Sequence, residues 1–232
     1  EPIVSWLLAE GRLLPTMEDM TRQLGQHLLD GGAPVCRFRL SIRTLHPLLA
    51  ASTSVWERDS ALIEPIESTH GIEQRSEYIG SPVQTITDTR GSFRKRLDEE
   101  LSDEDHTALH ELKARGFTDY FGLPLEFTEG ALGILVYSSD TPQGFNDVDI
   151  AKFKALAAVL APVAEVYSSK RVATAIAEAY LGPRTGRRVL NGQITRGDIE
   201  QITAAILISD IRDWTGVNSR MPAACALTLA NQ

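Results

Sequence analysis

The sequence lacks the features that mark several large classes of protein. It has two cysteines among its 232 residues, Cys36 and Cys225, too few and too far apart for a disulfide framework or a zinc site. It has no apolar run long enough to cross a bilayer, and its N-terminus lacks the basic flank and apolar core of a signal peptide. These absences predict a cytoplasmic protein with no membrane partner.

Positive charge is also scarce. The 23 Lys and Arg residues are outnumbered by 31 Asp and Glu residues, which gives a net charge of -8. Proteins that bind nucleic acid or anionic membranes usually carry a basic surface, so neither partner is expected. A Walker A sequence, a dinucleotide-binding glycine fingerprint and a CxxC pair are absent as well.

Residues 16–168 predict an α+β domain. Thr16 and Asp19 can cap a helix that ends at Gly31, and strict alternation of apolar and polar residues from Cys36 to Arg43 predicts a half-buried strand. The element order favours an antiparallel sheet with its helices gathered on one side. The other expected elements are strands at 49–57, 83–87, 120–127 and 131–138, and a helix at 102–116.

Two stretches of this region carry a resemblance to a known fold. They are TLHPLLAASTSVW and the terminal hairpin that ends in GILVYSSDTPQGFNDVDI. With the element order, they resemble the GAF domain, a small sensor fold related to PAS. The resemblance implies a regulatory domain that could take a small-molecule effector. The ligand stays unknown, because the Asn-Lys-Phe-Asp-Glu signature of cyclic-nucleotide-binding GAF domains is absent.

A long helix, of the kind that transmits signals, is expected from about Asn146 to Gly182, with a mild kink at Pro162. Apolar residues recur along one of its faces at steps of three and four, which is typical of a coiled-coil seam and predicts a homodimer through the long helices. The alternative is that this face packs on the sheet of its own domain. The expected seam residues are Phe153, Leu156, Leu160, Val163 and Tyr167.

The last part of the sequence carries a second resemblance. A Tyr-Leu-Gly phrase at 180–182 precedes a Gly-x-x-Val-Leu-x-Gly turn at 186–192, an Arg-Gly pair at 196–197 and Ser-Asp-Ile-Arg-Asp-Trp-Thr at 209–215. This order resembles the entry into the catalytic domain of bacterial class III nucleotide cyclases. It implies a partial, ferredoxin-like cyclase domain and an active site shared between two chains.

The two resemblances divide the chain into four regions. The expected regions are an N-terminal helix (1–15), a GAF-like sensor domain (16–168), a connecting segment (169–197) and the start of the cyclase domain (198–232). Because the sequence begins with Glu and ends inside this last domain, we expect it to be a segment of a longer protein.

Asp210 is the strongest metal-ligand candidate. Residues 204–208 form an apolar run typical of a strand buried on both faces, and a carboxylate at its end is costly unless it is paired or bound to a metal. Its hard oxygens suit Mg²⁺ or Mn²⁺. The alternative is that Asp210 only caps the next turn.

The cyclase resemblance assigns further roles near Asp210. The carbonyl of Ile211 would help to hold the metal, and the complete enzyme would convert ATP into cyclic AMP and pyrophosphate by two-metal catalysis; GTP stays open as the substrate. The backbone N–H groups of Arg212, Asp213, Trp214 and Thr215 would bind the phosphate oxygens of the substrate. The family usually has Gly and Phe where this sequence has Asp213 and Trp214.

This chain alone is expected to make no cyclic nucleotide. Residues 214–232 contain no acidic residue, so the second metal carboxylate of the family would lie beyond Gln232. One alternative is a non-enzymatic GAF module for ligand binding or dimerisation with a degenerate cyclase tail, which the Asp at 213 favours. A weaker alternative takes Asp210 as the phospho-acceptor of a receiver domain.

Other residues have weaker functional interpretations. His106 and His110 have zinc-ligand spacing, but a surface helix is the favoured interpretation, and Cys36 is expected to be a small core residue. The arginines of the 36–43 strand could line an anion-binding pocket, although pairing with the many acids is favoured. They are Arg37, Arg39 and Arg43.

Overall fold

The computed structural model describes residues 2–43, 49–60, 64–69, 71–193, 203, 205–208 and 210–230. The chain divides into two compact units, residues 1–193 and residues 194–232. The Arg-Gly pair at 196–197, Ala204 and Ser209 lie outside the described residues.

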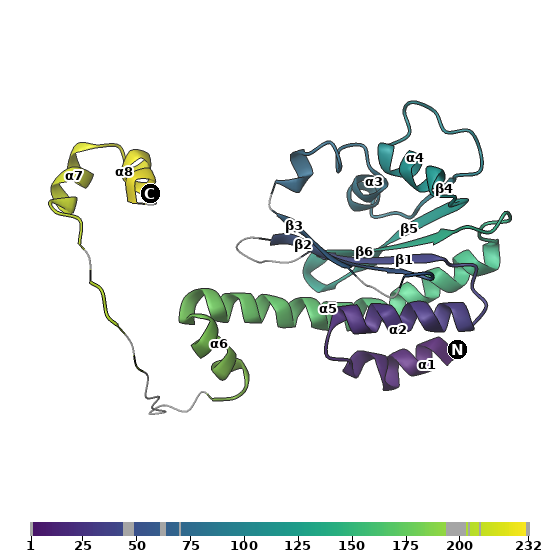
Figure 1. Cartoon of the computed structure of the whole chain (residues 1–232), viewed down its shortest axis with the longest axis horizontal. Coiled ribbons are helices and arrows are strands. Elements are labelled where there is room, and N and C mark those ends of the chain that lie inside the picture. The colour runs from purple at the N-terminus through teal and green to yellow at the C-terminus, as the bar shows by residue number, and fades with distance from the viewer. Residues whose placement is uncertain are drawn as a thin grey trace. The chain divides into compact units, whose positions relative to one another are not determined.

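The first unit is built on one six-stranded sheet, in which every neighbouring pair of strands is antiparallel. The spatial order is β3-β2-β1-β6-β5-β4 (Figure 1). The strands expected near 36–43, 49–57, 120–127 and 131–138 are all present. The bounds are β1 (Arg37–Arg43), β2 (Leu49–Glu57), β3 (Glu64–Thr69), β4 (Phe93–Arg96), β5 (Asp119–Glu126) and β6 (Leu132–Ser139).

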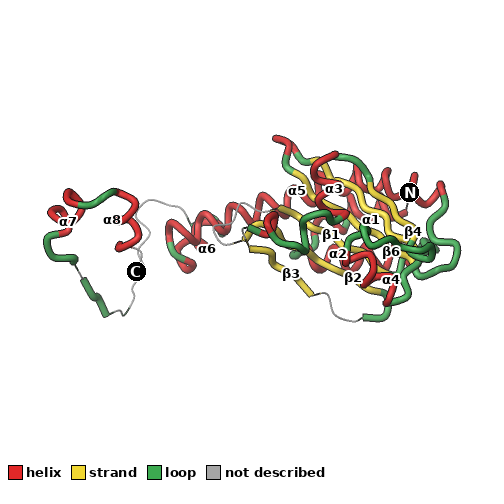
Figure 2. Tube along the Cα trace, turned by 90° about the horizontal axis from the view of Figure 1, so that it is seen from above, coloured by secondary structure: helices red, strands yellow, loops and turns green. Residues whose placement is uncertain are grey.

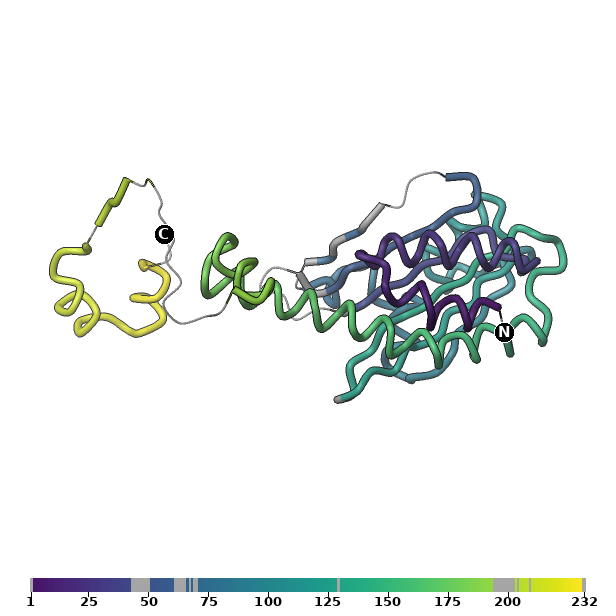
Figure 3. The backbone as a smooth tube through the Cα atoms, turned by 90° about the horizontal axis from the view of Figure 1, so that it is seen from below, coloured from purple at the N-terminus to yellow at the C-terminus, as the bar shows by residue number. Residues whose placement is uncertain are grey.

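Three helices cover one face of the sheet (Figure 3). They are α1 (Pro2–Ala9), which leads into the short 3-10 helix η1 (Gly11–Leu13), α2 (Met17–Asp30) and α5 (Asp147–Leu181). Their apolar side chains form one cluster with the inward residues of β1 and β6. Its centre is a ring stack in which the centroids of Tyr137 and Phe153 lie 4.0 Å apart. At Gly25 a Cβ atom would lie 2.3 Å from the Trp56 ring, so only glycine lets α2 approach β2 this closely.

Two shorter helices, α3 (Pro82–Thr89) and α4 (Thr107–Ala114), cover part of the opposite face (Figure 2). They pack on β4, β5 and β6 through a smaller apolar cluster that includes Ile86, Leu109 and Val136. A short 3-10 helix, η2 (Ile72–Gln74), follows β3. Helices therefore lie on both sides of the sheet, and the expectation of helices on one side is wrong.

Two of the expected elements on this face differ in the structure. Residues 83–87 are part of α3 and not a strand, because Ser81 caps Gln84 at 3.1 Å and Pro82 fits the first helical turn. The helix expected from Ser102 begins only at Thr107, capped by His106. Ser102 instead donates from its backbone N–H to Asp105 at 2.9 Å within the preceding turn.

Hydrogen bonds fix the segment between β6 and α5, both where it passes the sheet and where the helix begins. β5 and β6 are joined by η3 (Thr128–Gly130), and the chain after β6 returns to the sheet at Asp119, which is fully buried. Asp119 accepts from the Phe145 N–H at 2.9 Å and from Arg94 at 2.8 Å. Asn146 and Asp149 then form a reciprocal capping box at the first turn of the helix.

The structure buries the expected seam residues of α5 inside one chain. Phe153, Leu156, Leu160, Val163 and Tyr167 are each at most 8% exposed and belong to the cluster between α5 and the sheet. A second chain cannot reach them without opening this packing. The face is the one that packs on the sheet, as in the alternative interpretation, and it does not form the seam. After α5 the chain folds back at Gly182 into α6 (Pro183–Leu190).

The second unit contains two short helices, α7 (Trp214–Arg220) and α8 (Ala223–Ala230). The strand expected at 204–208 is not formed in the described part of this run, where Ile206, Leu207 and Ile208 are 86–92% exposed. A buried strand needs neighbouring strands to complete its hydrogen bonds, and the described residues of this unit supply none.

Among the described helices, none combines the length and the apolar character that crossing a membrane requires.

Candidate functional site

A cavity lies on the α3/α4 side of the sheet, over β1, β2 and β3, and extends under the edges of α3 and α4 to residues of β5 and β6. It consists of a main chamber of about 380 Å³ and an adjoining one of about 90 Å³. We call the two together the sheet cavity. Both chambers are lined by Arg39, Ser68, Ile72, Tyr78 and Val83. The cavity exists because α3 and α4 cover only the β4–β6 half of this face.

The alternation of β1 sends its arginines into this cavity. Phe38, Leu40 and Ile42 face α2 and α5, so Arg37, Arg39 and Ser41 face the opposite side. Ser41 shares a hydroxyl hydrogen bond of 2.9 Å with Thr53 on β2, which fixes its position. Arg39 donates from Nε to the Ser41 hydroxyl at 3.0 Å.

Arg39 has no counterion within the described part of the chain. Its recorded side-chain hydrogen bond is to Ser41, and no ion pair is recorded for it among the described residues. Burial lowers the pKa of its guanidinium, and the positive charge of Arg37 acts in the same direction. A cation held in such a place without an anion is costly, so its environment favours an incoming negative group.

The neighbouring arginines are neutralised, unlike Arg39. Arg37 pairs with Glu57 at 2.9 Å, and Arg115 pairs with the other oxygen of Glu57 at 2.7 Å. Three further carboxylates, Glu73, Glu77 and Glu111, are exposed side chains of the cavity lining.

Tyr120 supplies an uncharged donor beside the arginines. Burial raises the pKa of its hydroxyl to about 12, so it stays protonated at neutral pH. No hydrogen bond of this hydroxyl is recorded within the described residues. The remaining wall of the main chamber is partly apolar, with Ile72, Val83 and Val136. A molecule with one anionic end and one apolar body would match this lining.

The cavity lining offers groups suited to binding, namely a guanidinium, hydroxyls and apolar side chains. The cavity lining carries no paired nucleophile and base, and no group of three or more His, Cys, Asp or Glu side chains in the described part of the chain could hold a metal. Sequence reasoning picked out the arginine stripe, but it missed Tyr78 and Tyr120. Tyr120 could have been found from the alternation of its strand, whereas nothing in the irregular pattern around Tyr78 marks it.

The histidines and the buried cysteine are engaged elsewhere. His106 Nε2 lies 3.1 Å from the Ser76 carbonyl, and His110 Nε2 lies 3.1 Å from the Ser102 carbonyl. Cys36 is buried, as expected, and its thiol donates to the Ser138 carbonyl at 3.3 Å. Of the arginine stripe, only the side chain of Arg43 lies outside the described side chains.

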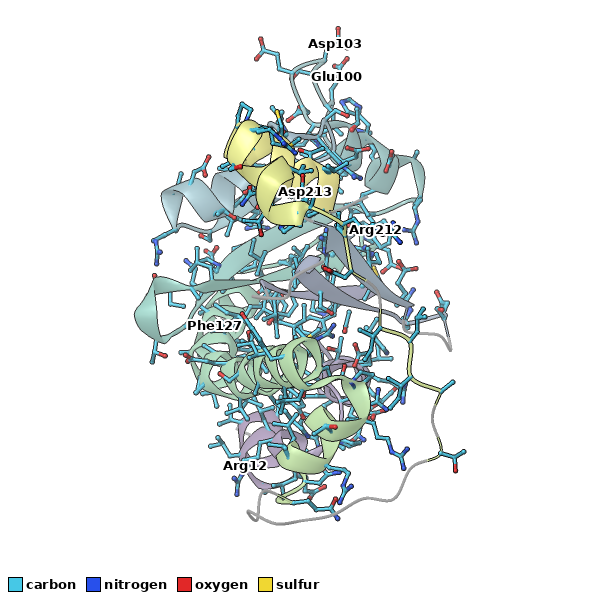
Figure 4. All side chains as sticks on the ribbon, turned by 90° about the vertical axis from the view of Figure 1, so that its left-hand side faces the viewer. Arg12, Glu100, Asp103, Phe127, Arg212 and Asp213 are labelled. Atoms are coloured by element: carbon cyan, nitrogen blue, oxygen red, sulfur yellow. The ribbon has the colours of Figure 1, made fainter. Side chains whose placement is uncertain are left out.

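The expected metal and phosphate residues lie in the second unit. Asp210, Ile211 and Arg212 are exposed and precede α7. Figure 4 labels Arg212 and Asp213 of this segment. Asp213 has the left-handed backbone φ of 53° and accepts from Arg220 at 2.7 Å. This conformation suits the glycine that is usual in the cyclase family, and Asp is among the residues that tolerate it best.

The residues present do not by themselves fit a divalent cation. Asp213 is occupied by Arg220, and the Ile211 carbonyl already accepts from the Trp214 N–H at 3.2 Å, which leaves the carboxylate of Asp210 and the second lone pair of that carbonyl as oxygen donors of this segment. Mg²⁺ and Mn²⁺ prefer six oxygen ligands, so further ligands would have to come from outside these residues. Two oxygen donors on an exposed segment are too few to fix a cation for a metal-assisted reaction.

No family model matches the sequence, and no curated protein sequence matches it. Solved structures do match. The phycoerythrobilin-bound GAF domain of a cyanobacterial phytochrome is 11% identical with a TM-score of 0.50, over 73% of this chain and 96% of that one. The phycocyanobilin-bound GAF domain of a cyanobacterial phytochrome gives the same identity, TM-score and share of this chain, and 95% of its own.

A GAF domain of a phosphoenolpyruvate-protein phosphotransferase from Coxiella burnetii is 17% identical over 73% of this chain and 94% of that chain, with a TM-score of 0.45. At such identities a likeness shows the fold and not the ligand or the activity. The phytochrome domains show that the first unit has a GAF domain fold, as the sequence resemblance implied.

Proposed function

We propose that the first unit is a regulatory GAF domain that binds a small molecule with an anionic group in the sheet cavity. The observation that carries the proposal is Arg39, a guanidinium without a counterion among the described residues that lines both chambers of the cavity. A carboxylate or phosphate beside it would form charge-assisted, bidentate hydrogen bonds, the strongest kind that a neutral-pH site offers.

The surroundings of Arg39 support one anionic group and not several. Glu57 already neutralises Arg37 and Arg115, and Tyr120 offers an uncharged donor beside them. The cavity volume lies at the lower end of the range of small-molecule sites. We therefore expect a ligand of modest size with a single acidic end and an apolar or aromatic body.

Matched pairs of ligands test this proposal on the 232-residue chain. Calorimetric titration would compare anions with their neutral counterparts, such as adenosine monophosphate with adenosine, and aromatic carboxylates with their amides. At least one anion should bind, and Arg39→Met should weaken that binding by about 100-fold, as expected for a lost charge-assisted contact. Arg22→Met on the outer side of α2 is the matched control and should bind normally.

Two results would count against the ligand proposal. The first is a panel in which the neutral partners bind as well as the anions. The second is an anion that keeps its affinity in the Arg39→Met protein, because Arg39 would then not be its partner.

We further propose that this sensor regulates a class III nucleotide cyclase domain that begins near residue 198. The support is the order of the short sequence motifs between Tyr180 and Thr215, together with the 35-residue helix α5, at whose C-terminal end these motifs begin. In that role Asp210 and the Ile211 carbonyl would hold Mg²⁺ or Mn²⁺ with ligands from outside this chain. The backbone N–H groups of 212–215 would receive phosphate oxygens.

The cyclase proposal has a separate test. The isolated chain should form no cyclic AMP from ATP, and Asp210→Ala in a longer protein that contains this chain should abolish the activity while leaving the fold intact. Full activity of that variant would remove Asp210 from the metal site. A longer protein without any cyclase activity would leave the non-enzymatic GAF module, which the Asp at 213 favours.

A further inference from the structure

The sheet cavity carries unpaired charges of both signs. We call its strand side the floor, and the segment 72–83 together with α4 the roof. On the floor, Arg39 uses Nε for its bond to Ser41, and no hydrogen bond of its two terminal nitrogens is recorded within the described residues. On the roof, Glu77 and Glu111 have exposed side chains, for which the described part of the chain records no ion pair and no hydrogen bond.

The two roof carboxylates come from different segments that are held together. Glu77 lies between η2 and α3, and Glu111 lies on α4. The ring of His106, which caps α4, lies 3.1 Å from the Ser76 carbonyl, so the residue before Glu77 is held against the start of that helix. Tyr78, the residue after Glu77, lines both chambers. Two carboxylates and an aromatic ring are groups that bind an ammonium ion.

The floor fits a carboxylate. Tyr120 is 6% exposed and lines the main chamber, and no hydrogen bond of its hydroxyl is recorded within the described residues. Burial raises the pKa of this hydroxyl to about 12, while the nearby charge of Arg39 acts in the opposite direction. The protonated hydroxyl and the planar guanidinium can donate to both oxygens of a flat, singly charged group.

The lining has no surplus of positive charge. Among the described residues that line the two chambers are three arginines and three glutamates, and Glu57 adds a carboxylate where it pairs with Arg37 and Arg115. A phosphate dianion would therefore enter a site in which carboxylates outnumber arginines. A ligand with an ammonium group as well as a carboxylate adds no net charge, so it avoids this repulsion.

We propose that the sheet cavity takes a linear zwitterion. Its carboxylate binds Arg39 and Tyr120 on the floor. Its ammonium group binds Glu77 and Glu111 on the roof, and a short apolar chain joins the two charges along the apolar wall of the main chamber. An α-amino acid, whose two charges share one carbon atom, would match only one end. This inference rests on the proposed anion site and adds a second charge and a separation to it.

A series of ω-amino carboxylates tests the two charges and their separation. Calorimetric titration of the 232-residue chain would compare β-alanine, γ-aminobutyrate, δ-aminovalerate and ε-aminocaproate, each with the carboxylate of the same length that lacks the amino group. At least one member should bind, and the affinity should pass through a maximum with chain length. The best member should bind about 10-fold more tightly than its deaminated counterpart, because it gains two partly exposed ion pairs.

Variants assign the two ends of the ligand. The double variant Glu77→Gln and Glu111→Gln should lower the affinity of the best zwitterion by about 10-fold without weakening its deaminated counterpart. Arg39→Met should weaken both ligands by about 100-fold. The matched control is Glu100→Gln with Glu104→Gln, which removes the same charge from two exposed positions outside the cavity lining and should bind both ligands normally.

The outcomes separate this inference from the anion site on which it rests. A carboxylate that binds as tightly as its ω-amino counterpart and depends on Arg39 would leave the anion site in place and overturn the zwitterion. Zwitterion binding that is unchanged in the Glu77 and Glu111 double variant would overturn it as well. If no member of the series binds at up to about 10 mM, the zwitterion is wrong whatever other anions bind. Binding that survives Arg39→Met would overturn both proposals.

Discussion

The two faces of the sheet are made by the same six strands but are covered in different ways. On one face α1, α2 and α5 form a continuous apolar cluster that is centred on the Tyr137–Phe153 stack. On the other face α3 and α4 cover only the β4–β6 half. Over β1 to β3 that second face carries arginines, hydroxyls and the sheet cavity.

This difference follows from the two-residue period of the strands. In β1 each core residue alternates with a polar one, so a strand that supplies Phe38 and Leu40 to the first face must present Arg37 and Arg39 to the second. Stability is therefore concentrated on the first face. The second face buries fewer apolar side chains and carries a charged cavity instead. Such a departure from close packing is typical of functional sites.

The largest effect should come from truncating the first face. Leu160→Ala removes a fully buried side chain from the cluster under α5 and should lower the free energy of unfolding by about 3 kcal/mol. Val83→Ala, which removes apolar atoms from a partly buried position beside the cavity, should cost less than about 1 kcal/mol. Urea titrations of both variants would measure the difference.

If the two substitutions lowered the free energy of unfolding by the same amount, the two faces would not differ in their contribution to stability. Val163→Ala serves as an internal check, because it deletes the same atoms as Val83→Ala but on the first face. Its cost should lie between those of the other two variants.

Arg39→Met should have a smaller effect and the opposite sign. Without ligand, the substitution removes a cation that has no counterion in the described structure, and the free energy of unfolding should rise by about 1 kcal/mol. Arg37→Met breaks the partly buried pair with Glu57 and should lower stability by a similar amount. Urea titration of the ligand-free proteins distinguishes the two neighbours.

A loss of stability in both variants would show that Arg39 is a structural residue, and the ligand proposal would lose its main support. Stabilisation by Arg39→Met, together with lost ligand binding, is the pattern that a residue kept for function should produce.

Much of the sheet could be predicted from the sequence, because its signals are local. The alternation from Cys36 to Arg43 needs no tertiary information, and the terminal hairpin is marked by two apolar runs around a short turn. Helix α3 was missed because its local pattern carries no clear signal. Its eight residues are rich in Val, Thr and Ile, and so short a run cannot show a helical period clearly.

Other features depend on what packs against a residue, which no local pattern contains. The three-and-four spacing from Phe153 to Tyr167 describes a face that is buried, but it does not say whether the sheet or a second chain buries it. The apolar run before Asp210 is similarly a strand only if neighbouring strands pair with it.

The candidate site was predicted in part. The arginine stripe is visible in the sequence, but the pairing register decides which arginine is neutralised. Arg37 lies opposite Glu57 on β2, whereas Arg39 lies opposite Val55. That register is set by the packing of both strands and not by the residues of β1 alone, so the sequence could not single out Arg39.

The smallest effect concerns the two thiols and tests how tightly the first face is closed. Burial, with the negative charge of Asp140 beside it, raises the pKa of Cys36 to about 12, while Cys225 is exposed in the second unit. At about pH 8 the Cys36 thiol should stay protonated and inaccessible, so a native chain should release one equivalent of chromophore quickly from a disulfide reagent. The second equivalent should appear only when urea unfolds the first unit.

In Cys225→Ser the fast phase should vanish, and Leu160→Ala should speed the slow phase by weakening the packing around β1. Rapid reaction of both thiols in the native protein would mean that the first face opens readily. The two faces would then differ in the residues that they carry and not in how tightly they are packed.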